Sequence, residues 1–89
     1  MSHYFVYLIQ CEDESIYTGI TTDLKRRFKE HQNKIGSNYT RAHKVKKILF
    51  SERHINRSKA LKREAEIKSW GREKKLALIN LKKKQESSE

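Results

Sequence analysis

The sequence has only one cysteine and no long hydrophobic run. Because Cys11 stands alone among 89 residues, the chain has no internal disulfide and no zinc site built from several cysteines. No stretch approaches the roughly 18 apolar residues of a membrane-spanning helix. Residues 1–10 also lack the basic segment and apolar run of a signal peptide. We therefore expect a cytoplasmic protein that does not associate with membranes.

Small size limits the kind of site that the chain can build. Hydrophobic residues make up 35% of the 89 positions. A domain of this length buries only about 60–65% of the surface that its unfolded chain exposes, so an enclosed cavity has little room. We expect one folded domain over residues 1–82, a polar and frayed tail over residues 83–89, and a shallow active surface. The protein should be a monomer or a weak dimer.

Acidic residues are scarce relative to basic ones. The sequence holds 21 Lys and Arg residues against 11 Asp and Glu residues, a formal net charge of +10. Residues 1–20 contain no Lys or Arg, so the whole excess of positive charge lies after residue 20. Such a positive field attracts polyanions, most commonly the phosphates of nucleic acids. We expect a nucleic-acid partner, with DNA favoured over RNA, and leave a protein partner of the repair type open.

Hydrophobic patterning and turn residues predict a small sheet flanked by helices. The first strand is apolar on both faces, which is typical of a central strand that is covered on both sides. Residues 34–40 are rich in Gly, Ser and Asn and indicate a loop. Strands are expected over residues 4–10, 16–20 and 44–51, and helices over residues 23–33, 56–69 and 72–82. The expected fold is α+β, a three-stranded mixed sheet in the order ββαβαα.

The common catalytic motifs are absent, which makes most enzyme classes poor candidates. There is no Gly-rich phosphate loop, no HExxH and no G-x-S-x-G. A scattered set of chemically capable residues remains, namely Tyr7, Tyr17, Arg27, His31 and Glu64. These types suit hydrolysis of a phosphodiester, which needs a deprotonated water and a cation beside the phosphoryl oxygens. Glu64 can hold one divalent cation, most simply Mg²⁺, and the planar fork of Arg27 suits a phosphate.

The spacing of these residues resembles that of the GIY-YIG nuclease superfamily. The resemblance covers about residues 3–80 and is carried by Phe5-Val6-Tyr7, Tyr17-Thr18-Gly19, Arg27, His31 and Glu64. Together with its size, the stretch Tyr39-Thr40-Arg41 makes the chain similar to the small stand-alone members, an uncharacterised bacterial group. Two positions depart from the family motifs, because Phe5 stands where a glycine is usual and Thr18 where an aliphatic residue is usual.

The resemblance implies hydrolysis of DNA or RNA with one metal ion per site. It places Tyr7 and Tyr17 beside the scissile phosphate and the attacking water, and it makes Gly19 the glycine that gives the site room. It makes Arg27 the phosphate ligand, Glu64 the metal ligand and His31 a partner in proton transfer. A tyrosine with a pKa near 10 is a poor base at neutral pH. Whether a tyrosine or His31 takes the proton from water therefore stays open.

Other interpretations of the same residues also stay open. The side chains of Arg26, Tyr39, Arg41, Lys44, Lys46 and Lys47 could contact nucleic acid, or they could form an ordinary solvated face. Tyrosines in strands are often packing residues, and Glu64 could simply pair with Lys68 one helical turn later. The alternative function is a nucleic-acid-binding module of the same fold with little or no turnover. A third interpretation is an interaction protein in a repair or ribosomal assembly.

Overall fold

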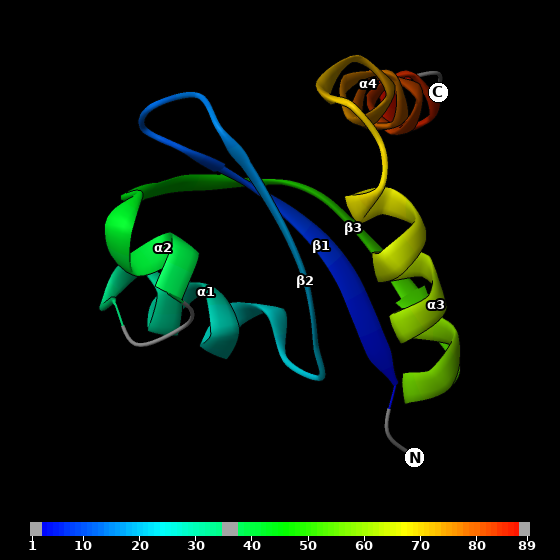
Figure 1. Cartoon of the computed structure of the whole chain (residues 1–89). Helices are drawn as coiled ribbons and strands as arrows, with labels where there is room; N and C mark the ends of the chain where they lie inside the picture. The colour runs from blue at the N-terminus through cyan, green and yellow to red at the C-terminus, as the bar shows by residue number, and fades with distance from the viewer. Residues whose placement is uncertain (1–2, 35–37, 88–89) are drawn as a thin grey trace.

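A computed structural model describes residues 3–34 and 38–87 and shows a three-stranded sheet between two groups of helices (Figure 1). The strands are β1 (Tyr4–Cys11), β2 (Ile16–Thr21) and β3 (Val45–His54). The helices are α1 (Leu24–Gln32), α2 (Asn38–Ala42), α3 (Arg57–Lys68) and α4 (Arg72–Ser87). Part of the predicted loop, residues 35–37, lies outside the described residues.

The sheet has the order β2-β1-β3, and β1 pairs antiparallel with both neighbours. The expectation of a mixed sheet was therefore wrong in this detail, although the α+β class is confirmed. The register defines two ends of the sheet. At the turn end, Cys11 pairs with Val45 beside the β1–β2 turn. At the open end, Phe5 pairs with Thr21 and Tyr4 pairs with His54, so the segments that lead into α1 and α3 start there.

Successive side chains of β1 point to opposite faces of the sheet, and each face is covered. Val6 and Leu8 pack in a core with residues of α3 and α4, including Ala60, Ile67 and Ile79. Tyr7 and Ile9 pack on the other face with Leu24 and Phe28 of α1. Figure 1 shows α1 and α2 on one side of the sheet and α3 and α4 on the other. This two-sided cover explains the continuous apolar run of the first strand.

Side-chain caps set the starts of α1 and α3. The carboxylate of Asp23 accepts a hydrogen bond from the backbone N of Arg26 at 3.0 Å. The side chain of Asn56 likewise accepts from the backbone N of Lys59 at 2.9 Å. Both caps satisfy backbone donors that a helix start leaves unpaired. The helix starts expected from the sequence are therefore confirmed to within one or two residues.

Two elements differ from the expectation. The short helix α2 was not predicted, so the observed order is ββααβαα. A helix of five residues is unstable by its own propensity and forms here because tertiary contacts hold it, including those of the fully buried Thr40. Helix α4 ends at Ser87, five residues beyond the predicted end near residue 82. Residues 83–87, which were expected to belong to a frayed tail because they are polar, are therefore part of the helix.

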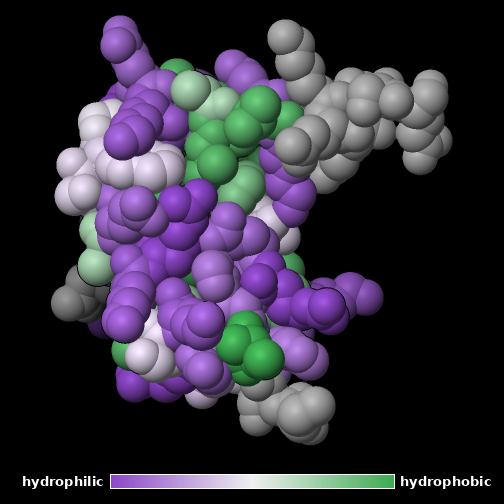
Figure 2. Space-filling model, turned by 90° about the vertical axis from the view of Figure 1, so that its right-hand side faces the viewer, coloured by the Kyte–Doolittle hydropathy of each residue, from purple (hydrophilic) through white to green (hydrophobic). Residues whose placement is uncertain are grey.

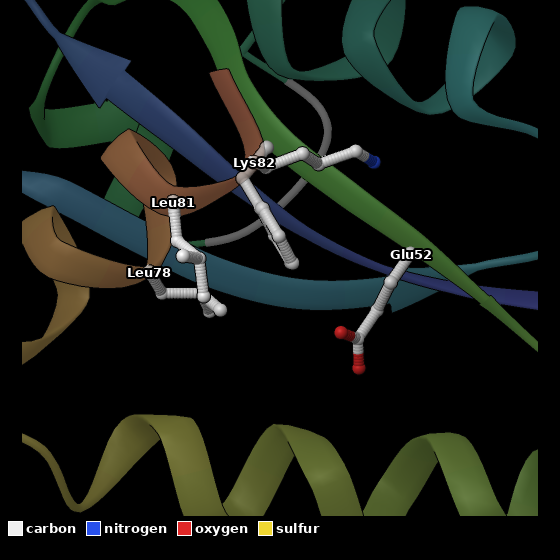
Figure 3. A pocket seen from close by; sticks show the side chains of 5 residues that line it. Glu52, Leu78, Leu81 and Lys82 are labelled. Atoms are coloured by element: carbon white, nitrogen blue, oxygen red, sulfur yellow. The ribbon is translucent and has the colours of Figure 1, made fainter. Parts of the chain in front are cut away.

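Helix α4 closes one side of the sheet and leaves a small hollow beside β3. Lys82 donates a hydrogen bond to the carbonyl of Ser51 and lies 5.0 Å from the ring centroid of Phe50. Glu52, Leu78 and Leu81 line the hollow of about 250 Å³ between these elements (Figure 3). Figure 2 shows a hydrophobic patch at the height of α4 on a largely hydrophilic face. Across the described part of the chain, no helix has the length and apolarity to cross a membrane.

Candidate active site

Tyr7 is the centre of a cluster of aromatic and charged side chains on the α1 face of the sheet. Tyr7 is only 1% exposed, and its Oη lies 2.8 Å from Nε2 of His31. The ring centroids of Tyr17 and His31 lie 6.3 and 5.9 Å from that of Tyr7. The structure therefore brings together three of the residues named from the sequence, from β1, β2 and α1.

Gly19 provides the space that the Tyr7 hydroxyl occupies. The two residues face each other in the register of β1 and β2. A Cβ atom at position 19 would lie 2.6 Å from Tyr7 Oη and 2.8 Å from its Cζ. Real Cβ atoms do not approach so closely, and the buried ring has little freedom to move away. The glycine of the second motif is thus a steric requirement of the cluster.

His31 connects Tyr7 to a residue that sequence reasoning did not assign to the site. The His31 Nδ1 atom lies 2.7 Å from Oγ1 of Thr40, and both residues are buried. A continuous chain of close polar contacts therefore runs from Tyr7 through both ring nitrogens of His31 to Thr40. Thr40 belongs to the family-like stretch Tyr39-Thr40-Arg41, but the surrounding loop-like composition hid the helix that carries it.

Arg27 and Glu64 act on Tyr7 from two further elements. Arg27 of α1 pairs with Glu30 at 2.8 Å, and its hydrogen bond and charge favour a lower pKa of Tyr7. Glu64 of α3 has a side chain that is 16% exposed, and its negative charge favours a higher pKa of Tyr7. Glu64 also makes the expected ion pair with Lys68, at 3.2 Å. All the candidate catalytic residues thus lie in contact with Tyr7 or within its electrostatic range.

Burial decides the charge states of the central pair. Burial of the phenol raises the pKa of Tyr7 to about 12, despite the opposing hydrogen bond from Arg27. Burial, followed by the charge of Arg27, lowers the pKa of His31 to about 4. The substrate-free site therefore holds a neutral phenol and a neutral imidazole rather than a phenolate and an imidazolium.

The buried neutral His31 should make the fold sensitive to mild acid. Its folded pKa of about 4 lies below the value of 6.5 of a free histidine, so between these values the unfolded chain binds more protons. The contribution of His31 to stability is therefore fully present above about pH 6.5 and is lost as the pH falls toward about 4. We expect the free energy of unfolding to drop by about 2 kcal/mol between about pH 7 and pH 5, measured by urea denaturation.

The substitution His31→Gln should remove most of this pH dependence, whatever it does to stability at neutral pH. His43→Gln is the matched control, because its side chain is 36% exposed and lies outside the buried contacts with Tyr7 and Thr40. An equal slope of stability with pH in wild type and His31→Gln would contradict the assignment of a buried, neutral His31.

Glu64 is the candidate ligand for a divalent cation. Within residues 3–34 and 38–87, no group of three or more His, Cys, Asp and Glu side chains could hold a metal ion. A single carboxylate nevertheless fits Mg²⁺, which usually keeps several waters and takes one or two protein carboxylates. The donor is a hard oxygen on a partly buried side chain, and its partner Lys68 is 53% exposed and free to turn into solvent. The residues present thus fit a magnesium site with one protein ligand.

The predicted nucleic-acid contacts fall into two groups. Lys44, Lys46 and Lys47 lie at the turn end, where the acidic β1–β2 turn offsets part of their charge; Lys46 Nζ lies 4.0 Å from a Glu14 carboxylate oxygen. Arg26 is instead exposed at the open end, beside Arg27. Arg41 is exposed on α2.

Tyr39 is less available for base stacking than the sequence suggested. Its ring stacks on His43 with a centroid distance of 4.2 Å and on Tyr17 at 5.8 Å. A nucleobase that stacked on the His43 side would have to replace that imidazole.

Comparison with known proteins shows which sequences and which fold this chain resembles. Residues 3–77 match the GIY-YIG catalytic domain. A UPF0213 protein of Haloquadratum walsbyi is 47% identical over 76 residues, covering 85% of each chain. A UPF0213 protein of Staphylococcus saprophyticus is 39% identical, covering 90% of this chain and 98% of its own. The solution NMR structure of the UPF0213 protein BH0048 from Bacillus halodurans aligns with a TM-score of 0.59 at 36% identity, covering 90% of this chain and 85% of that one.

Proposed function

The chain belongs to the GIY-YIG nuclease superfamily, and from this membership we propose that it is a divalent-metal-dependent endonuclease that hydrolyses phosphodiester bonds, with DNA as the favoured substrate. The observation that carries the proposal is the convergence on one buried phenol. Tyr7 contacts His31, and its pKa responds to Tyr17, Arg27 and Glu64. Four other residues that are scattered over the sequence thus act on the hydroxyl group of Tyr7.

Each side chain has a role that its chemistry suits. Arg27, which carries a permanent charge, binds the scissile phosphate and stabilises the charge that develops on its oxygens. Tyr17 lies with its ring edge against His31 at a centroid distance of 5.2 Å and walls the site on the β2 side. The strand is held through its phosphates by the exposed cations Arg26, Arg41, Lys44, Lys46 and Lys47. Tyr39 stacks on a base that takes the place of the His43 ring.

Tyr7 and His31 together move the proton of the attacking water. A phenolate does not form in advance, because burial raises the pKa of Tyr7 and lowers that of His31, so both groups are neutral before substrate binds. The transfer from water to Tyr7 and from Tyr7 to Nε2 of His31 is therefore coupled to attack on phosphorus. An anionic phosphate beside the imidazole favours this transfer, because it raises the pKa of His31. Glu64 would hold the divalent cation, which when bound would supply Lewis-acid stabilisation of the phosphate oxygens.

The direct test is cleavage by the purified full-length protein. Branched, nicked and linear DNA and the corresponding RNA are incubated with and without Mg²⁺, and the products are separated on denaturing gels. We expect Mg²⁺-dependent cleavage of at least one DNA substrate. Salt-sensitive binding without any product would instead support the binding-module alternative. If the protein neither bound nor cleaved nucleic acid, both functions would be contradicted.

Thr40 should act as a positioning residue for His31. If Nδ1–H donates to Thr40 Oγ1, then Nε2 is left to accept the proton of Tyr7. We expect ¹⁵N NMR to show the Nδ1–H tautomer of His31 in wild type and in Thr40→Ser. Thr40→Val, which is isosteric but has no hydroxyl, should lose that preference and cleave about tenfold more slowly. Wild-type tautomer populations and rate in Thr40→Val would contradict this role.

A further inference from the structure

A second hollow lies at the open end of the sheet, next to the candidate active site. It has a volume of about 310 Å³, and its lining includes Thr22, Arg26, Arg27 and Arg57. The register explains why residues so far apart in sequence meet there. Thr21 ends β2 opposite Phe5, and His54 ends β3 opposite Tyr4, so α1 and α3 both begin at this edge of the sheet (Figure 1).

The hollow is strongly cationic. Three guanidinium groups line it, and none of its lining residues is acidic. Glu30 pairs with Arg27 at 2.8 Å and with Arg26 at 3.7 Å, and Asp23 caps α1, but neither carboxylate lines the hollow. Among the described residues the side chain of Arg57 makes no hydrogen bond and no ion pair, and Arg57 is the first residue of α3. The positive ends of two helices add to the field of the arginines.

We propose that this hollow is a second phosphate subsite, in which Arg57, Arg26 and the hydroxyl of Thr22 bind a backbone phosphate that flanks the scissile one. Arg27 links the two sites, because it lines the hollow and also acts on Tyr7. The planar fork of an arginine suits a phosphodiester through paired N–H donors. This subsite rests on the proposed nuclease function, since it extends the path of the same strand.

The proposal distinguishes Arg57 from the other cations of α3. Lys62 lies on the same helix, is exposed and does not line the hollow. Removal of either residue lowers the net charge by one, so long-range attraction alone predicts equal losses of binding. A phosphate subsite predicts unequal losses, because only Arg57 faces a bound phosphate. Arg57→Ala and Lys62→Ala are therefore matched variants.

The test measures binding of a short fluorescent DNA duplex at several salt concentrations, in EDTA so that no cleavage occurs. We expect Arg57→Ala to weaken binding by at least about fivefold. The slope of the logarithm of the binding constant against the logarithm of the salt concentration should become shallower by about 0.9, the value for one lost phosphate contact. Lys62→Ala should change the affinity less than about twofold. Circular dichroism confirms that both variants fold.

A second measurement locates the subsite without DNA. Titration with inorganic phosphate should shift the amide NMR signals of Thr22 and Arg57 in wild type and leave the Thr22 signal in place in Arg57→Ala. Equal binding losses in the two variants, or no DNA binding by the wild type, would overturn the subsite. Because these readouts need no turnover, unequal losses in a protein that cleaves nothing would sustain the subsite while the proposed nuclease function fails.

Discussion

Glu64→Gln should abolish cleavage and leave the fold and DNA binding intact. The amide keeps the shape of the carboxylate but loses the negative charge that a divalent cation requires. We expect the cleavage rate to fall by at least about 1,000-fold, as for other losses of transition-state charge stabilisation. Stability should change by less than about 0.5 kcal/mol, since the ion pair with Lys68 is partly exposed and spans one helical turn.

Glu66→Gln is the matched control for this prediction. Glu66 lies two residues later on α3, is exposed and pairs with Arg63 at 2.7 Å. The same chemical change is thus made on the same helix, away from Tyr7. A Glu66→Gln variant should cleave at the wild-type rate. Full activity in Glu64→Gln would remove Glu64 from the reaction and, with it, the one-carboxylate metal site.

Gly19→Ala should damage both stability and activity, because the added methyl group would overlap the Tyr7 hydroxyl. The ideal Cβ position is 2.6 Å from that oxygen, and the ring sits in a buried core. We expect a loss of about 1–3 kcal/mol in the free energy of unfolding, typical of an overpacked core. Displacement of Tyr7 from His31 should also lower cleavage by about 100-fold or more. Urea denaturation and a cleavage assay measure the two effects.

Gly71→Ala provides the comparison within the same chain. Gly71 has no atom within 4 Å of its would-be Cβ, and no described glycine has a positive φ. Alanine there should be neutral or should stabilise the protein by about 0.4–1 kcal/mol. Equal effects of Gly19→Ala and Gly71→Ala would contradict the explanation that the Tyr7 hydroxyl leaves no room for a side chain at position 19.

Local sequence signals predicted the elements that form by local rules. The oxygens of Asp23 and Asn56 marked the starts of α1 and α3, because a cap needs only neighbouring backbone donors. The continuous apolar run of β1 indicated a strand with two covered faces. Helix α2 escaped this reasoning, since its five residues hold their shape through Thr40 and the stacked ring of Tyr39. The antiparallel pairing of β3 escaped it too, since pairing direction depends on the path of the intervening helices.

The spacing from Tyr7 to Glu64 was sufficient to indicate the family, because the family's chemistry needs those residue types at those positions. Composition alone also determined the positive charge and the absence of a disulfide framework. Only the tertiary structure decided the charge states of Tyr7 and His31. Both follow from burial, and burial depends on the packing of distant segments around a side chain. The same holds for the hydrogen-bonded Thr40 and for the meeting of Arg57 with Arg26 at the open end. Contacts between distant segments arise from strand register, and register is a property of the folded sheet.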